Sequence, residues 1–309
     1  MKNRRDLSAM LLRIEKSSMH DGEGLRTVVF LKGCNLRCIW CSTPESQYAG
    51  VQIGFDASHC WDCGACAEKC PNQAISRRFD GRIVADQESC CHCLHCQNNC
   101  PQKALFSYGY EVSVSEVLDE VLKDDVFYFY SSGGVTVSGG EPLLQADFVT
   151  ELLRLCKNHG LNTALETSFC LPWNQAAKPL PYLDTLFVDL KHSESDLHKK
   201  ITGMENDAVL ANIILADNSP ELFEMVMRLP LIPGLNDDDQ NLRKTAALAA
   251  SLIKLKYLEI VPYHRLGSGT YAKLDREYAL LDMPTPSPMY VAEKCALIMS
   301  YQPNLEVRG

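Results

Sequence analysis

The sequence predicts an α/β protein whose parallel sheet, built from βαβ units, is interrupted by a small cysteine-rich insert. After residue 109, short runs rich in β-branched residues alternate with helical stretches, which is typical of a parallel sheet. Residues 54–108 instead lack long apolar periodicity and contain an internal repeat of roughly 30 residues. We therefore expect residues 1–53 and 109–309 to form the core and residues 54–108 to form an inserted domain.

The order of the core elements follows from the same pattern. Two N-terminal strands, LLRIEKS and RTVVFLKG, precede the first cysteines and can open the sheet. Later strands are expected in GGVTVSG, LNTALET, TLFVDLK, FEMVMRLP and LKYLEIVPY. Helices are expected near residues 146–159, 206–216 and 238–254. Loops that follow the strands would then meet at one edge of the sheet, where α/β proteins bind ligands.

Composition narrows the class of protein. The chain of 309 residues is 46% apolar and 22% charged, which suits a folded protein with a sizeable core. Its formal net charge is −9 and its basic residues form no run, so a nucleic-acid partner is not expected. The N-terminus MKNRRDLSAMLLRIEKSS has only a short apolar run, and no stretch is long enough to cross a membrane. We therefore expect a cytoplasmic protein.

The insert carries two copies of one cysteine pattern, C-x2-C-x2-C-x3-C-P. This is the spacing of bacterial two-cluster ferredoxins, in which the fourth cysteine ligates the other cluster. One [4Fe–4S] cluster is expected on Cys60, Cys63, Cys66 and Cys100, and the other on Cys90, Cys93, Cys96 and Cys70. Zinc is the alternative, because C-x2-C pairs also form tetrahedral zinc sites. The spacing does not require Cys91, His92 or His95.

A separate group of three cysteines, Cys34, Cys38 and Cys41, lies before the insert. Three thiolates on a [4Fe–4S] cluster leave one iron without a protein ligand, and an open metal position is typical of a catalytic site. The aromatic Trp40 fits a loop that shields such a cluster. Taken alone, the spacing also allows a three-cysteine zinc or redox site. The remaining thiols, Cys156, Cys170 and Cys295, follow no pattern and are expected to be buried.

Further motifs accompany these cysteines. C-x3-C-x2-C with an aromatic residue before the last cysteine resembles the radical S-adenosylmethionine (SAM) superfamily, and VSGGEPLLQ resembles its GGE motif. A narrower resemblance, to the glycyl-radical-enzyme activating enzymes, rests on HDGEGLRTVVFLKGC, WCSTPES, LFVDLKH, MRLPLIPGLND, LEIVPYHRLG and the placement of the insert. The best-known member of that family activates pyruvate formate-lyase. Together with the strand–helix alternation, the resemblance implies a partial (β/α)6 barrel.

The resemblance implies a set of SAM contacts. The open iron would chelate the amino and carboxylate groups of SAM. Gly139, Gly140 and Glu141 would hold the methionine amino group, Lys191 would contact the methionine end, and His264 would contact the ribose or adenine. Glu166, Thr167 and Asp189 would lie beside the SAM carboxylate, where the family's best-known member places a monovalent cation. Asp21 and Arg228 match positions that contact the glycine-bearing loop of the partner.

Three residues depart from the family pattern. Glu166 stands where Asp is familiar, Glu23 stands where the D-G-P-G motif has Pro, and Asn35 stands where many members have Pro. Without the resemblance, ordinary roles would be favoured for the site residues. Asp189 would cap a strand end, His264 would be a satisfied polar core residue, and Arg228 would pair on the surface.

The implied activity is reductive cleavage of SAM to methionine and a 5′-deoxyadenosyl radical, which takes a Cα hydrogen from a glycine of a partner enzyme. A reduced ferredoxin or flavodoxin would supply electrons through the two insert clusters, and the chain would act anaerobically as a monomer. One alternative is another radical SAM enzyme with auxiliary clusters, such as a sulfatase-maturing enzyme or a ribonucleotide reductase activase. A second is a non-catalytic iron–sulfur electron carrier.

Overall fold

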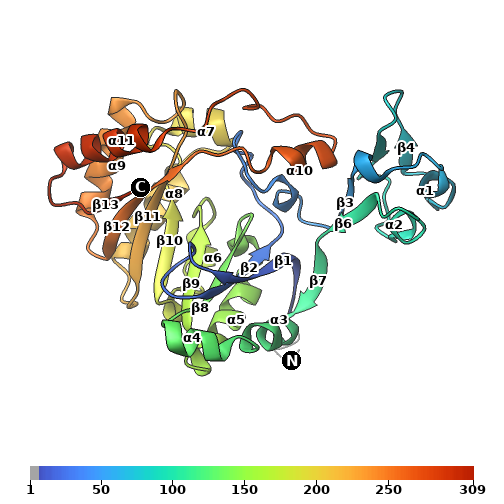
Figure 1. The fold of residues 1–309 in the computed structure, drawn as a ribbon. Coiled ribbons are helices and arrows are strands. Elements are labelled where there is room, and N and C mark those ends of the chain that lie inside the picture. Colours follow the sequence, from blue (N-terminus) through green and yellow to red (C-terminus); the bar gives the residue numbers. More distant parts are fainter. Residues whose placement is uncertain (1–6) are drawn as a thin grey trace.

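A computed structural model describes residues 7–309 of the chain (Figure 1). Residues 1–6, the start of the N-terminal segment from which a cytoplasmic location is predicted, lie outside the described part. Within residues 7–309, no helix is both long and apolar enough to cross a membrane.

A nine-stranded mixed sheet forms the centre of the molecule, in the order β13-β12-β11-β10-β9-β8-β2-β1-β7. The strands are β1 (Ser8–Ser18), β2 (Arg26–Leu31), β7 (Tyr110–Ser113), β8 (Gly134–Gly139), β9 (Asn162–Thr167), β10 (Thr185–Asp189), β11 (Glu224–Leu231), β12 (Leu255–Pro262) and β13 (Val307–Arg308). Strands from β2 through β8–β12 to β13 pair in parallel, while β1 pairs antiparallel with both β2 and β7. All strands expected from the sequence are present. The antiparallel extension through β7 and the short β13 were not expected.

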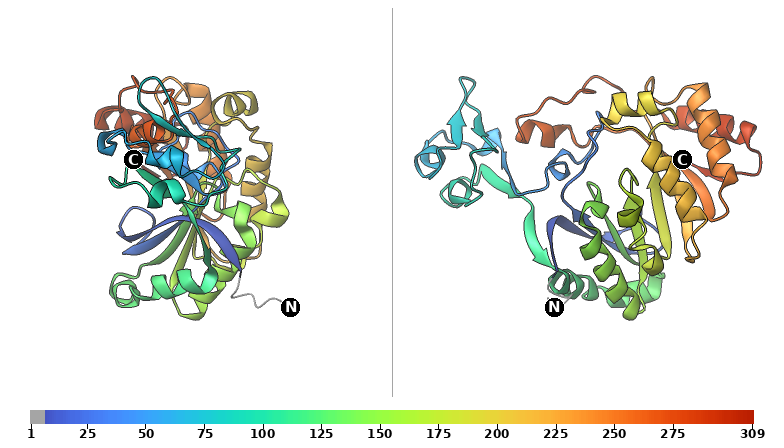
Figure 2. Two further views of the ribbon diagram at one scale, coloured as in Figure 1. Left: turned by 90° about the vertical axis from the view of Figure 1, so that its right-hand side faces the viewer. Right: turned by 180° about the vertical axis from the view of Figure 1, so that it is seen from behind.

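The helices lie on the outer side of the curved sheet, except α10 (Ser268–Lys273), which lies toward the cysteine-rich segment (Figure 1 and Figure 2). They are α3 (Val114–Leu122), α4 (Asp125–Ser131), α5 (Ala146–Asn158), α6 (Trp173–Ala176), α7 (Ser195–Thr202), α8 (Asp207–Asp217), α9 (Asp239–Ser251), α10 (Ser268–Lys273) and α11 (Pro288–Tyr301). Their starts carry the expected chemistry. Ser113 and Glu116 form a capping box on α3, Asp238 caps α9, and Ser287 caps α11. The three helices expected from the sequence correspond to α5, α8 and α9.

The core lies between the sheet and these helices. The middle strands are largely buried, and Val135 and Val137 of β8 and Leu186 and Val188 of β10 have no exposed surface. Strands of parallel sheets are covered on both faces, which explains this continuous burial. Cys156, Cys170 and Cys295 are buried, which confirms the prediction for the three thiols outside the patterns.

The cysteine-rich segment leaves the sheet after β2 and lies to one side of it, at the right of Figure 1. The antiparallel pair β3 (Gln52–Phe55) and β6 (Leu105–Tyr108) closes its base. Beyond this base lie two four-residue helices, α1 (Ala65–Glu68) and α2 (His95–Asn98), and the hairpin β4 (Ile75–Arg77) and β5 (Ile83–Ala85). Exposed ion pairs connect the segment to the region of α10, where Asp275 pairs with Arg78 at 2.5 Å and Lys273 with Asp56 at 3.1 Å.

Candidate functional site

The three-cysteine loop opens into a cavity of about 290 Å³ at the carboxyl ends of the parallel strands. The loop follows β2 and is fixed by backbone hydrogen bonds from Gly33 N to the Ser46 carbonyl (2.7 Å) and from Arg37 N to the Thr202 carbonyl (2.6 Å). Burial raises the pKa of the Cys34 and Cys38 thiols to about 12. A metal bound here must therefore displace protons from three shielded thiols, as cluster assembly does.

Gly139 and Gly140 allow two loops to approach closely. Gly139 has φ of +126°, and a Cβ there would lie 2.1 Å from the Leu31 carbonyl oxygen. A Cβ on Gly140 would lie 2.3 Å from the carbonyl oxygen of Gly33. The amide of Gly140 instead donates to the Leu31 carbonyl (3.0 Å), and the amide of Glu141 to that of Gly33 (2.8 Å). Only glycine fits this junction, which fixes the end of β8 against the start of the cysteine loop.

Glu141 is fully buried and does not line the cavity. Its carboxylate accepts hydrogen bonds from Thr167 Oγ1 (2.8 Å), from Ser168 N (2.9 Å) and Oγ (2.7 Å), and from Leu143 N (3.1 Å). Burial raises its pKa, and these donors partly offset that effect. In this structure, the carboxylate therefore fixes the turn after β9 and has no side-chain position facing the cavity, in contrast to the contact implied by the resemblance.

Replacing Glu141 with alanine should lower the free energy of unfolding by about 2–5 kcal/mol, because several buried donors lose a charged acceptor. Urea denaturation of the two proteins measures this loss. Glu205→Ala serves as the control, since Glu205 makes only an exposed pair with Lys199, and its effect should stay within about 0.5 kcal/mol. Equal effects of the two substitutions would show that the buried carboxylate does not organise the turn.

An ion pair lies on the wall of the cavity, where Lys191 Nζ donates to Asp189 Oδ2 at 2.9 Å. Both residues line the cavity. Asp189 is the last residue of β10, and Lys191 follows two residues later. Burial alone would lower the pKa of Lys191, but attraction to Asp189 and to the Cys38 and Cys34 thiols outweighs burial and raises it. The ammonium is therefore charged and stands beside the three-cysteine loop.

A second charged group lies deeper, on the inward-facing side chains of three strands. Arg228 Nε donates to Glu259 at 2.5 Å, and its Nη1 contacts Glu166, which also accepts from Ser138 Oγ at 2.5 Å. The guanidinium lies 4.1 Å from the ring centre of Phe187. Burial would lower the pKa of Arg228, but the two carboxylates outweigh it and raise it. Arg228 is therefore an internal pairing residue and not a surface one.

The cavity gathers most of the site residues predicted from the sequence. Its lining includes Cys34, Cys38, Trp40, Cys41, Gly139, Gly140, Glu166, Thr167, Asp189, Lys191 and His264. His264 is exposed at the rim. Asp21 and Arg228 are not part of the lining, but they lie close together, because Arg228 Nη2 donates to the His20 carbonyl at 3.3 Å.

The residues that depart from the family pattern have partners of their own. Asn35 Nδ2 donates to the carbonyl of Cys170, which ties the cysteine loop to the turn after β9. Glu23 is exposed and pairs with Lys256 at 2.6 Å.

Some site residues were missed by sequence reasoning. Ser138, Ser168 and Gln47 line the cavity, and Glu259 completes the charge group around Arg228. Ser138 and Ser168 could have been predicted from the sequence, because Ser138 directly precedes the glycine pair and Ser168 directly follows Thr167. Glu259 could not have been predicted in this way, since its contact with Arg228 depends on the register of β11 and β12.

The insert brings the four thiols of the first predicted set together, and it brings Cys96 of the second set close to Cys90 and Cys70. A cavity is lined by Cys60, Cys63, Cys66 and Cys100, and the pKa of Cys96, raised to about 11 chiefly by burial, is also raised by Cys90 and Cys70. Amides of Ala74 and Ala104 donate to the Sγ atoms of Cys70 and Cys100, both at 3.2 Å. Within residues 7–309, no three His, Cys, Asp or Glu side chains are grouped to hold a single metal ion. Four thiols around a cavity, with amide donors to sulfur, suit an iron–sulfur cluster.

Known proteins resemble this chain over most of its length. Residues 91–246 match the radical SAM superfamily and residues 59–105 match the 4Fe-4S dicluster domain. The chain is 39% identical over 277 residues to the (2S)-3-sulfopropanediol dehydratase activating enzyme of Klebsiella oxytoca, covering 88% of this chain and 87% of that one. It is 38% identical over 299 residues to the choline trimethylamine-lyase activating enzyme of Oleidesulfovibrio alaskensis, covering 95% and 96%. The structure of Streptococcus suis SuiB bound to precursor peptide SuiA shares the fold, with a TM-score of 0.52 at 13% identity, over 91% of this chain and 47% of that one.

Proposed function

Because the chain belongs to the glycyl-radical-enzyme activating enzymes of the radical SAM superfamily, we propose that its cavity holds SAM beside an open [4Fe–4S] cluster on Cys34, Cys38 and Cys41. The chain is a radical SAM oxidoreductase. With the cluster bound, it cleaves SAM reductively to methionine and a 5′-deoxyadenosyl radical, which takes a Cα hydrogen from a glycine of a partner enzyme. The observation that carries the placement of SAM is that three thiols and a lysine–aspartate pair line one cavity.

The chain's own residues would bind and orient SAM. The Lys191 ammonium, fixed by Asp189, offers a positive charge to the methionine carboxylate. Gly139 and Gly140 also line the cavity, and their backbone groups would hold the amino group, while Glu141 supports the adjoining turn from beneath. His264 at the rim lies where the ribose or adenine would emerge.

No additional cation is needed to balance the carboxylates at this site. Glu166 is paired with Arg228 and Asp189 is paired with Lys191. A monovalent cation bound beside Glu166, Thr167 and Asp189 would have to compete with both basic side chains. The arrangement therefore does not fit the cation site implied by the family resemblance.

The partner is a glycyl radical enzyme, and its glycine loop would approach the cavity past Asp21 and Arg228. Support comes from the contact between Arg228 and the His20 carbonyl, which places both candidates for loop binding together. The carbonyl of Asp21 accepts from Thr136 Oγ1 at 2.7 Å, so the loop that carries Asp21 is held by the sheet itself. Such fixed groups can orient an incoming peptide without being ordered first.

The assignment is tested with anaerobically reconstituted protein and dithionite. We expect 5′-deoxyadenosine to form, and an EPR signal of a glycyl radical to appear when a candidate glycyl radical enzyme is added. The signal should vanish when the target glycine of the partner is replaced by alanine. Failure to cleave SAM with a fully loaded protein would contradict the proposal.

Residues 54–108 would form a ferredoxin-like domain with two further [4Fe–4S] clusters, which brings the total to three. The two cysteine sets of the insert and the amide donors to sulfur support this domain. Reduced flavodoxin or ferredoxin would be the donor. The cluster-ligand spacing of most cysteines suits action in the reducing cytoplasm, where thiols are kept from forming disulfides. The chain would act as a monomer.

Replacing Cys93 with alanine should slow activation of the partner by reduced flavodoxin by about tenfold or more. Loss of a residue that only supports a metal ligand typically lowers activity by about 10–100-fold, and loss of the ligand itself should have at least that effect. Activation driven by dithionite, a small reductant that reaches the SAM cluster directly, should change by less than about twofold. The neighbouring Cys91→Ala variant is the control, since the ferredoxin spacing does not use Cys91. Undiminished flavodoxin-driven activation of the Cys93 variant would mean that the insert is not a relay.

A further inference from the structure

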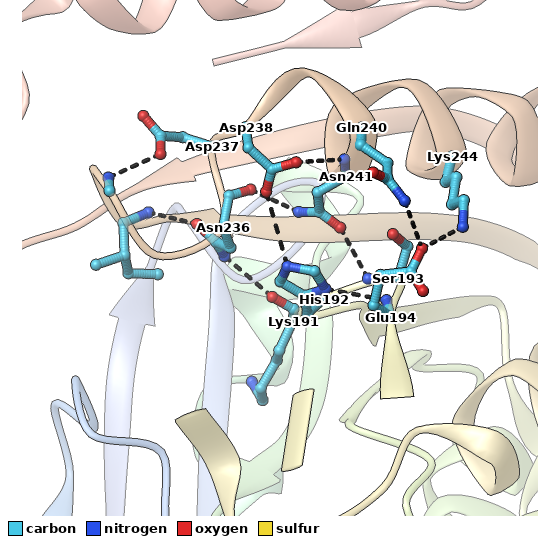
Figure 3. A network of polar contacts seen from close by, with 12 residues as sticks. Lys191, His192, Ser193, Glu194, Asn236, Asp237, Asp238, Gln240, Asn241 and Lys244 are labelled. Carbon is cyan, nitrogen blue, oxygen red and sulfur yellow. Dashed lines mark hydrogen bonds and ion pairs between the residues drawn. The ribbon is translucent and has the colours of Figure 1, made fainter. Parts of the chain in front are cut away.

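A buried polar network lies behind the cavity, between the loop after β10 and the loop that joins β11 to α9 (Figure 3). At its centre is Asn236, which has no exposed surface. Its Nδ2 donates to the Lys191 carbonyl at 3.0 Å and to the Pro230 carbonyl at 2.5 Å, and its Oδ1 accepts from Ile232 N at 2.8 Å. One side chain thus holds three backbone groups on two loops.

The three residues that Asn236 holds share one property. Lys191, Pro230 and Ile232 all line the cavity. A primary amide supplies two donors and an acceptor on one rigid plane, which is the combination that these three backbone groups require. We propose that Asn236 is a positioning residue for SAM binding, which sets the distance between the Lys191 ammonium on one wall and the Pro230–Ile232 backbone on another.

Neighbouring contacts make the position of Asn236 itself rigid. The Asn241 amide donates to the Asn236 carbonyl at 2.5 Å and accepts from Ser193 N at 2.8 Å, which ties the two loops together a second time. Asp237 accepts from Gly234 N at 2.7 Å, and its carbonyl accepts from Lys294 of α11 at 2.7 Å. The loop is therefore braced from α9 and from the C-terminal helix, so a change at Asn236 should act mainly on the cavity wall.

This inference rests on the placement of SAM proposed above and assigns a function to a residue that does not touch SAM. Asn236→Asp keeps the size and the acceptor but turns both donors into an oxygen facing two carbonyl oxygens. Asn236→Ala removes all three bonds. Both should raise the Kd of SAM by about 10–100-fold, the effect typical of residues that orient a binding group from behind.

The control is Asn212→Asp. Asn212 is equally buried and donates to the carbonyls of Phe169 and Leu171 at 2.9 and 2.8 Å, and neither of those residues lines the cavity. This variant loses the same kind of bonds, so its thermal stability should fall comparably, while its Kd for SAM should stay within about twofold. Asn241→Ala, which removes only the outer tie, should give an intermediate Kd.

The readout is a SAM titration of the reduced, cluster-loaded proteins, followed by the change in the EPR spectrum of the cluster and by equilibrium dialysis. Thermal stability and iron content are measured on the same samples, so a variant that fails to fold is recognised and Asn241→Ala then carries the test. A wild-type Kd in the Asn236 variants, or an equal rise in Asn212→Asp, would overturn the inference. Absence of SAM binding by the wild-type protein would instead overturn the placement of SAM.

Discussion

Replacing Cys38 with alanine is expected to reduce SAM cleavage to background while leaving the two insert clusters in place. Cys38 is buried in the middle of the three-cysteine loop, and the loop has no further thiol that could substitute for it. A [4Fe–4S] cluster held by two protein ligands is not retained, so the variant should lose about one third of its iron. Iron content, EPR of the reduced protein and 5′-deoxyadenosine formation measure the three consequences.

The matched control is Cys156→Ala. Cys156 is also fully buried, on α5, and its pKa is likewise raised to about 12 by burial. It lies outside the cavity and outside both cysteine sets, so it should keep full iron content and SAM cleavage, with only a modest packing loss. Retention of SAM cleavage by Cys38→Ala would mean that the three-cysteine loop does not hold the catalytic cluster.

Replacing Arg228 with methionine should lower the free energy of unfolding by roughly 3–5 kcal/mol, because it strands partly buried carboxylates. The guanidinium is 12% exposed, and its partners Glu166 and Glu259 are 19% and 29% exposed. Adding Glu166→Gln should recover part of the loss, since the uncompensated charge is then removed. Denaturant unfolding of the single and double variants gives both values.

Arg243→Met is the control for this substitution. Arg243 also pairs with a carboxylate, Asp239, and lies 4.3 Å from the ring centre of Tyr301, but both members of the pair are 62% exposed. Its removal should cost less than about 1 kcal/mol. A comparable loss in both variants, or no recovery in the Glu166→Gln double variant, would show that the charge group around Arg228 does not stabilise the inner face of the sheet.

The parts of the fold that the sequence predicts are those with a local signal. The apolar runs predict strands β8–β12, and the cysteine spacings predict both the three-cysteine loop and the insert. The antiparallel strand β7 has no such signal, because its four residues become a strand only by pairing with β1. Edge pairings of this kind depend on tertiary contacts rather than on local pattern.

The site shows the same division. Gly139 and Gly140 can be recognised in the sequence because no residue with a side chain fits at either position. The partners of Arg228 instead depend on the register of neighbouring strands. In the register of the sheet, Arg228 of β11 lies opposite Asp189 of β10 and opposite Glu259 of β12. Glu141 illustrates the limit of motif reading, since the motif finds the residue, but burial decides that its carboxylate faces the protein. Asn236 lies within the MRLPLIPGLND motif, but its contacts could not be predicted, because its three partners are backbone groups.

The strand pair at the base of the insert has a topological consequence. Gln52 and Tyr108 lie opposite each other in β3 and β6, so the chain leaves and re-enters the main body at neighbouring points. β2 precedes this excursion and β8 follows it after β7, α3 and α4, and the two strands still pair directly in parallel. The whole cysteine-rich segment is thus attached at a single place on the main body, so an insertion there requires no rearrangement of the parallel strands.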